Sequence, residues 1–161
     1  MPGDQLYPAV ASNGSSFLVA WEDRRSGNID ETDIYASRVA ADGTTLDPDG
    51  IPLATAAGLQ WTPEVASDGT NFLVVWTDSG RGNRSDVRAA RVTPQGEVLD
   101  PGGFVLTGPE QYGGYRPHAA FDGDNYLVTY ENCYCIRGIR VAPDGTILDP
   151  AGSRSRTAMV T

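Results

Sequence analysis

The sequence contains no lysine, one histidine, two cysteines and no long apolar run. All 12 basic residues are therefore arginine, and against 21 acidic residues they leave a net charge of −9. A field of that sign repels phosphate backbones and anionic lipid surfaces. A membrane helix needs about 18 apolar residues, whereas the longest apolar run here is 72–76. We expect neither nucleic acid nor membrane as a partner.

The two cysteines, Cys133 and Cys135, are too few for a disulfide framework and too few for a zinc site of their own. On one strand face their sulfurs would be neighbours, so a local disulfide, a chelate for a soft metal and an interchain bridge are alternatives to two idle thiols. Residues 1–6 show no charged segment followed by an apolar one. We therefore expect no secretory signal peptide in this chain.

Glycine and proline are abundant, with 19 and 11 residues, which argues against long helices. The length of 161 residues suits one domain. Three parallel passages begin at Pro8, Pro63 and Pro117, with spacings of 55 and 54 residues, and such self-similarity marks a repeat architecture. The prediction is a single repeat domain, 1–161, with units at approximately 7–60, 61–114 and 115–161.

Each unit has the pattern of four strands joined as two hairpins. Asn-Gly or Asp-Gly at 13–14, 68–69 and 122–123 predicts a type I′ turn with positive φ at both central residues. The second strand is apolar on both alternating faces, which indicates a sheet covered on both sides. Each second strand ends in an aromatic residue, namely Trp21, Trp76 or Tyr130.

These patterns predict an all-β fold of three four-stranded antiparallel repeats arranged as β-propeller-like blades. A β-trefoil, which also closes with three four-stranded units, is the alternative.

A second turn in each unit predicts an ion pair. With residues 42–43 at the centre of a two-residue turn, 41 pairs with 44 and 40 with 45, so that Arg38 lies opposite Asp47. Each such cross-strand pair is worth on the order of 0.2–1 kcal/mol. The same count applies to all three units and predicts the pairs Arg38–Asp47, Arg91–Asp100 and Arg140–Asp149.

The repeat also resembles a known kind of blade. Residues 63–78, Pro-Glu-Val-Ala-Ser-Asp-Gly-Thr-Asn-Phe-Leu-Val-Val-Trp-Thr-Asp, are followed by Asp-Val-Arg-Ala-Ala-Arg-Val and Gly-Glu-Val-Leu-Asp-Pro. This pattern is similar to blade-type repeats of large exported bacterial proteins, and the third unit departs from it in its loop. The resemblance implies a propeller-like fold and an extracellular or cell-surface location, and it implies no particular activity.

Three blades are too few to close a ring, because propellers typically have four to eight. The open edges therefore have to be covered. We expect a homo-oligomer, with a dimer that forms a six-bladed ring favoured. Another oligomer count and a larger parent propeller are the alternatives.

Unit one has an acidic loop after its second strand. Asp23, Asn28, Asp30 and Asp33 are oxygen donors of the kind that Ca²⁺ takes, six to eight at a time. Their spacing matches no EF-hand loop. The favoured interpretation is therefore that such side chains cap backbone N–H groups, with calcium as the one cofactor considered.

Positions that differ between units are more informative about function than repeated ones. Ala9, Glu64 and His118 each follow the repeated proline, on the strand that usually lines the channel of a propeller. Glu64 and His118 are expected to meet there, either as a base and its partner or as a hydrogen-bonded pair without a chemical role. Tyr112 and Tyr115, separated by two glycines, are candidates for stacking on a sugar.

No nucleophile-elbow, zinc-protease or phosphate-loop motif is present. We therefore expect no catalytic residue and no enzyme. The expected function is a non-enzymatic repeat module that binds a protein or glycan ligand and closes by self-association. The alternatives are a carbohydrate-binding lectin and an accessory or catalytic part of a polysaccharide-degrading enzyme, in which two carboxylates would converge.

Overall fold

A computed structural model of the chain describes residues 3–28, 30–81, 84–107, 113–132 and 135–149. Within these ranges every regular element is a β-strand. The described residues accordingly include no helix with the length and apolar character to span a bilayer. The strands form three antiparallel sheets.

Each sheet is built from one repeat unit. Sheet 1 pairs β1 (Gln5–Ser12), β2 (Ser16–Asp23), β3 (Asp33–Ala40) and β4 (Ile51–Ala54) in that order. Sheet 2 pairs β5 (Gln60–Ser67), β6 (Phe72–Arg81), β7 (Arg84–Val92) and β8 (Phe104–Val105). Sheet 3 pairs β9 (Tyr115–Phe121), β10 (Tyr126–Asn132) and β11 (Cys135–Val141).

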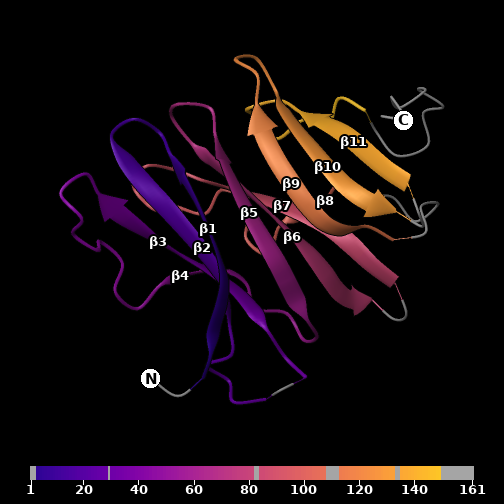
Figure 1. Ribbon diagram of the computed structural model, residues 1–161, viewed down its shortest axis with the longest axis horizontal. Helices are drawn as coiled ribbons and strands as arrows, with labels where there is room; N and C mark the ends of the chain where they lie inside the picture. Colours follow the sequence, from indigo (N-terminus) through magenta and orange to yellow (C-terminus); the bar gives the residue numbers. More distant parts are fainter. Residues whose placement is uncertain (1–2, 29, 82–83, 108–112, 133–134, 150–161) are drawn as a thin grey trace.

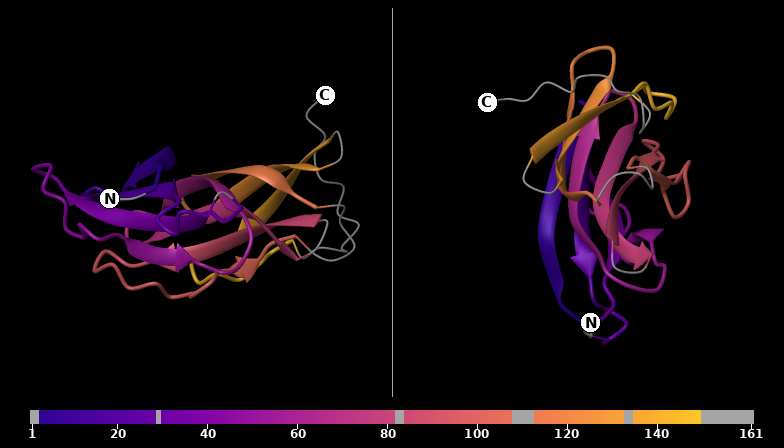
Figure 2. Two further views of the ribbon diagram at one scale, coloured as in Figure 1. Left: turned by 90° about the horizontal axis from the view of Figure 1, so that it is seen from below. Right: turned by 90° about the vertical axis from the view of Figure 1, so that its right-hand side faces the viewer.

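The sheets follow one another in chain order, from the indigo and purple sheet 1 to the orange and yellow sheet 3 (Figures 1 and 2). The predicted all-β, antiparallel, propeller-like arrangement is confirmed at this level. A trefoil would pair strands of different units in a shared barrel, whereas the strands described here form sheets only within their own unit. The fourth strand predicted for the third unit falls in 150–161, outside the described residues.

The core lies between consecutive sheets. We call the side of a sheet that looks toward the following sheet its forward face, and the opposite side its rear face. One apolar cluster joins Leu18 and Ala20 of β2 to Phe72, Val74 and Trp76 of β6. A second joins Leu73 and Val75 of β6 to Tyr126, Val128 and Tyr130 of β10. The apolar strand β6 is therefore covered on both faces, because alternate side chains point to opposite sides of a sheet.

The β1–β2 turn differs from the predicted type I′ turn. The backbone N–H of Asn13 donates to the carbonyl of Ser16 at 3.2 Å, so the central residues are Gly14 and Ser15, one position later than predicted. Of these two only Gly14, with a φ of 90°, is left-handed, as in a type II′ turn. The cause is the Asn13 side chain, whose Oδ1 accepts the N–H groups of Ser15 and Ser16 at 3.0 and 2.9 Å.

The β3–β4 turn has the predicted ion pair in a different register. Val39 pairs with Thr45, one position away from the predicted alignment, because the turn has three residues with Gly43 at a φ of 88°. Asp47 reaches back, and its Oδ2 accepts both the backbone N–H and the Nε–H of Arg38. The shortest side-chain separations are 2.7 Å in Arg38–Asp47, 2.8 Å in Arg91–Asp100 and 2.9 Å in Arg140–Asp149.

The same arginines also connect neighbouring sheets. Nη1 of Arg38 in sheet 1 donates to the carbonyl of Pro94 in the turn of sheet 2, at 3.1 Å. Nη1 of Arg91 in sheet 2 donates to the carbonyl of Asp144 in the turn of sheet 3. The first and second repeats therefore each tie the turn of the next repeat to their own Arg–Asp pair.

Candidate functional site

The first strands of the three sheets, β1, β5 and β9, lie next to one another (Figure 1) and carry the same irregularity. The residue before the repeated proline has a left-handed φ, which is 51° at Tyr7, 50° at Thr62 and 48° at Arg116. This conformation is uncommon for residues other than glycine and costs about 1–3 kcal/mol unless the surroundings hold it. The register of each strand pair shifts at this point, as in a β-bulge.

The bulge turns a backbone N–H toward the preceding sheet. The N–H of Thr62 donates to Oε1 of Glu22 at 2.8 Å, and the N–H of Arg116 donates to Oγ1 of Thr77 at 3.1 Å. Glu22 is 3% exposed. Its burial raises the pKa of the carboxyl, while the Thr62 N–H and the charge of Arg24 oppose that rise. These bonds hold the strained backbone in place at both inter-sheet contacts.

Glu64 and His118 come together just beyond this bulge. Nδ1 of His118 lies 3.4 Å from Oε1 of Glu64, across the gap between β9 and β5. The side chain of His118 is 71% exposed and that of Glu64 is 38% exposed, so both are open to solvent and to a ligand. The equivalent residue of sheet 1, Ala9, contributes no polar group. A carboxylate beside an imidazole is an arrangement that can accept and return a proton.

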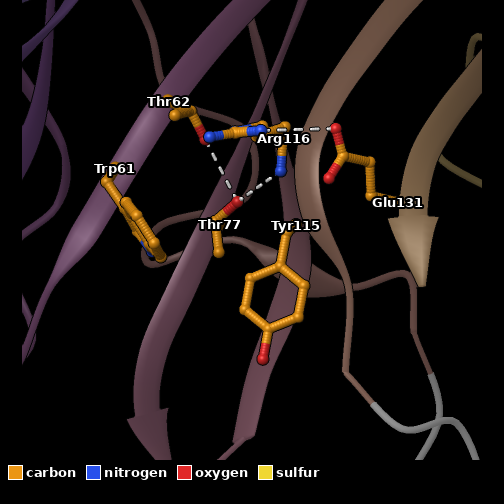
Figure 3. Close-up of a pocket in the computed structure, with 6 residues that line it drawn as sticks. All are labelled: Trp61, Thr62, Thr77, Tyr115, Arg116 and Glu131. Atoms are coloured by element: carbon orange, nitrogen blue, oxygen red, sulfur yellow. Dashed lines mark hydrogen bonds and ion pairs between the residues drawn. The ribbon is translucent and has the colours of Figure 1, made fainter. Parts of the chain in front are cut away.

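A pocket of about 260 Å³ lies at the start of β5 and β9, between sheets 2 and 3. Trp61 and Tyr115 lie on either side of Thr77 in the view of Figure 3. Their ring centroids are 6.5 Å apart, and the angle between the ring planes is 81°. The volume is just below the usual range of about 300–1,000 Å³ for ligand pockets, so it suits one small ligand unit. The pocket is lined by Trp61, Thr62, Thr77, Tyr115, Arg116 and Glu131.

The remaining wall of the pocket is polar. Nη1 of Arg116 lies 3.5 Å from Oε1 of Glu131, and their side chains are 69% and 51% exposed (Figure 3). The hydroxyls of Thr62 and Thr77 are 3.1 Å apart. The pocket therefore offers two aromatic rings together with donors and acceptors, two residues away along β5 and β9 from Glu64 and His118.

The acidic residues proposed for calcium have other partners. Both carboxylate oxygens of Asp23 bind Arg25, at 2.8 Å to Nε and 2.7 Å to Nη2, and Nε1 of Trp21 donates at 2.9 Å. Burial would raise the pKa of Asp23, but these hydrogen bonds outweigh it and lower the pKa to about 2. Within the described ranges, no three Asp, Glu, His or Cys side chains are grouped to hold a metal ion.

The other members of that loop also act locally. Oδ1 of Asn28 accepts the backbone N–H of Asp30 at 3.1 Å, which is the capping role expected of such side chains. Asp33 faces Asp23 across β2 and β3. Burial and the negative charges of Asp23 and Glu31 raise its pKa. The arrangement around Asp23 is thus an ion pair that closes the loop.

The structure describes one residue of each of the two remaining predicted pairs, Tyr112–Tyr115 and Cys133–Cys135. Tyr115 lines the pocket, whereas Tyr112 lies outside the described residues. Cys135 carries a free thiol whose Sγ is 3.0 Å from the carbonyl oxygen of Asn132, and Cys133 is again outside the described residues.

Three residues of the pocket, Trp61, Arg116 and Glu131, were not predicted as site residues from the sequence. A signal for two of them exists, because Trp61 and Arg116 stand at or beside the position before the repeated proline, where the units differ. Glu131 stands where the other sheets have Glu22 and Thr77. Variation at a repeated structural position is therefore the feature that marks this pocket.

No family model matches the sequence, and no curated protein matches it. Solved structures match its fold. The α-L-arabinofuranosidase of Lactobacillus brevis matches 89% of this chain with a TM-score of 0.56 and 14% identity. TcdA4 of Morganella morganii matches 90% with a TM-score of 0.51 and 9% identity. The endo-arabinase of Bacteroides thetaiotaomicron matches 94% with a TM-score of 0.48 and 16% identity.

The chain spans 55% of the arabinofuranosidase, 7% of TcdA4 and 57% of the endo-arabinase. At these identities the matches describe the fold.

These comparisons correct our expectation that the chain is not an enzyme. That expectation was wrong because it took a repeated architecture without a catalytic motif as a sign of a pure scaffold. The fold match to an arabinofuranosidase over 89% of the chain overturns it. A repeated fold can carry chemistry on the few residues that differ between its repeats.

Proposed function

We propose that the three sheets are blades of a carbohydrate-active β-propeller. In this proposal the pocket at Trp61 and Tyr115 binds a sugar ring, and Glu64 with His118 supplies acid–base chemistry for cleavage of a glycosidic bond. The observation that carries the proposal is the aromatic pocket next to an exposed carboxylate–imidazole pair.

The composition of the pocket supports a sugar as ligand. A sugar ring has apolar C–H faces and a rim of hydroxyl groups, so it needs an aromatic surface together with polar side chains that donate and accept hydrogen bonds. Trp61 is 37% exposed and offers such a surface. Arg116 donates only, while Glu131 accepts, so the two can hold neighbouring hydroxyls in one orientation.

The pair beyond the pocket supports bond cleavage. Hydrolysis of a glycoside requires a group that protonates the leaving oxygen and a group that activates water or attacks the sugar. Glu64 is an exposed carboxylate two residues along β5 from Thr62 of the pocket, and His118, 3.4 Å away, can hold or release the proton that Glu64 exchanges. We propose that Glu64 protonates the leaving oxygen as the glycosidic bond breaks and regains its proton through His118, while Glu131 of the pocket wall takes the proton of the attacking water.

The fold match supports one substrate class as the first to test. The arabinofuranosidase similarity suggests α-L-arabinofuranosyl-containing glycans as the first class to test. Because the chain spans 55% of that enzyme, the proposal includes the blades that complete the ring. An extracellular or cell-surface location, which the repeat resemblance implies, suits a role on glycans.

The test combines binding and turnover. Titration calorimetry with linear arabino-oligosaccharides, and release of nitrophenol from 4-nitrophenyl α-L-arabinofuranoside, are measured on the whole chain. Trp61→Ala should weaken binding by about tenfold, which is about 1.4 kcal/mol, while Trp61→Phe keeps a ring and loses less. Glu64→Gln should lower kcat by about 10²–10⁴-fold.

Glu97→Gln is the matched control, because this exposed glutamate lies in the β7–β8 turn, far along the chain from the pocket. It should leave binding and kcat unchanged. A folded protein that neither binds nor cleaves any glycan of the panel overturns the proposal. Cleavage that survives Glu64→Gln removes the catalytic role of the Glu64–His118 pair.

A further inference from the structure

The forward face of sheet 3 is an interface surface without its neighbour. Leu18 of sheet 1 and Leu73 of sheet 2 are both 0% exposed, because the following sheet covers them, whereas the equivalent Leu127 of sheet 3 is 46% exposed. On the third strand Ile136 is 55% exposed, while its equivalents Ile34 and Val87 are both 0% exposed. The third sheet thus keeps the apolar residues that pack against a following sheet.

The rear face of sheet 1 is the complementary surface. Phe72 and Tyr126, which pack against the preceding sheet, are 0% and 1% exposed, whereas the equivalent Phe17 is 41% exposed. Val10 is 61% exposed, and its equivalent Val65 in sheet 2 is 7% exposed. Figures 1 and 2 place sheets 1 and 3 at opposite ends of the chain, so these two faces do not cover each other within one chain.

Each internal interface also contains a polar contact, and its acceptor and donor recur separately on the two open faces. At each internal interface, a side chain late in the second strand accepts the N–H of the left-handed residue in the next sheet, as in the bond from Thr62 to Glu22. Sheet 3 carries the acceptor of that link in Glu131, which is 51% exposed, and sheet 1 carries the left-handed residue in Tyr7, which is 64% exposed.

Among the described residues, the hydrogen bond from an arginine to the turn of the next sheet is likewise missing its partner at the open faces. Nε and Nη2 of Arg140 bind Asp149, as in the other sheets, but Nη1 of Arg140 contacts no carbonyl in the part of the chain that the structure describes. On sheet 1 the turn that would receive it contains Gly43. A Cβ on Gly96 or Gly145 would lie 2.8 or 3.1 Å from the arginine of the preceding sheet, whereas a Cβ on Gly43 meets nothing within 4 Å.

We propose that a second copy of this chain closes the ring, with the forward face of sheet 3 of each copy packed on the rear face of sheet 1 of the other. The two faces match because they are the two halves of an interface that the chain already forms twice within itself. Two copies give six blades, which lies within the usual four to eight, whereas three copies would give nine. The contact is head to tail and closes by twofold rotation.

Light scattering on a sizing column tests this closure without any ligand, so the result does not depend on the proposed function. The whole chain should have twice its mass of 17.1 kDa, about 34 kDa. Ile136→Asp and Phe17→Asp, on opposite faces, should each give a 17.1 kDa species, because in a twofold dimer of identical chains each substitution lies in both contacts. Both positions are exposed in a single chain, so a cooperative thermal transition should persist in both variants.

The matched control is Leu99→Asp. Leu46, Leu99 and Leu148 are equivalent and are 44%, 38% and 39% exposed, so a neighbouring sheet does not cover this position, and the control should remain a dimer. A mixture of the Ile136→Asp and Phe17→Asp chains should recover a 34 kDa species, about twice 17.1 kDa, through its one intact interface.

Three results overturn the proposal. One is a wild-type chain that stays at 17.1 kDa at every concentration. Another is a dimer that withstands Phe17→Asp, because that dimer would join two copies of the sheet 3 face. The third is a ladder of masses that grows with concentration, because a ladder indicates an open chain of copies.

Discussion

The two internal interfaces share one plan and differ in the side chain that accepts one hydrogen bond. Both have an apolar cluster, an arginine that reaches the next turn and a bond to a left-handed residue. At the sheet 1–sheet 2 interface the acceptor of that bond is Glu22, which is buried. At the sheet 2–sheet 3 interface it is Thr77, and a pocket opens beside it. A shorter side chain at a repeated position is thus associated with space for a ligand.

The largest loss of stability is expected from the apolar clusters, which both internal interfaces share. Phe72→Ala removes a side chain that is 0% exposed from the first apolar cluster and should cost about 3–5 kcal/mol of unfolding free energy. Phe17→Ala, at the equivalent position on the open rear face, should cost far less in a monomeric background such as Ile136→Asp. Urea denaturation of both variants measures the difference, and equal losses would show that the two faces are equally packed.

A substitution at Thr77 tests whether the shorter side chain at this position is what opens the pocket. Thr77→Glu places a glutamate where Glu22 stands at the other interface and fills part of the pocket. Overpacking should cost about 1–3 kcal/mol, and sugar binding should fall by more than about tenfold. Thr77→Ser, which keeps the hydroxyl that accepts the Arg116 N–H, is the control in both calorimetry and urea denaturation. Unchanged sugar affinity in Thr77→Glu would show that the sugar does not bind in this pocket.

The arginine link should be stronger inside the chain than at its open end. Arg38→Gln breaks a half-buried pair with Asp47 and the bond to Pro94, and it should cost about 1–3 kcal/mol. Arg140→Gln removes a pair whose arginine is 55% exposed and screened by solvent, so in a monomeric background it should cost clearly less than Arg38→Gln. Thermal melting in low and high salt checks the order, since only the exposed pair should be strongly screened.

The smallest effect concerns the buried carboxyl of the first interface. Burial raises the pKa of Glu22 in the folded state, so the folded protein loses stability as rising pH ionises this group. Glu22→Gln keeps an oxygen that can accept the Thr62 N–H but has no charge. It should therefore be more stable than the wild type at neutral pH and equal to it at pH 4, as measured by urea denaturation at both pH values. A Glu22→Gln variant that is no more stable than the wild type at neutral pH would contradict the prediction.

Much of the fold could be predicted from local patterns. The repeat spacing, the strand pairs and the proximity of Glu64 to His118 follow from equivalent positions in equivalent strands. The turn geometry could not, because the Asn13 side chain competes for backbone N–H groups and shifts the turn by one residue. The partner of Asp23 could not be predicted either, because capping and calcium were the roles considered for this residue and the sequence does not reveal that Arg25 occupies both of its carboxylate oxygens.

The sequence by itself determined the all-β class, the three units and the Arg–Asp partners, because periodicity and turn residues act over a few positions. Only the tertiary structure decided that Trp61 and Tyr115 form one pocket and that the faces of sheets 1 and 3 stay open. The reason is physical. A pocket and an uncovered face depend on how separate sheets stack, and stacking depends on side-chain volumes that meet only after the chain has folded.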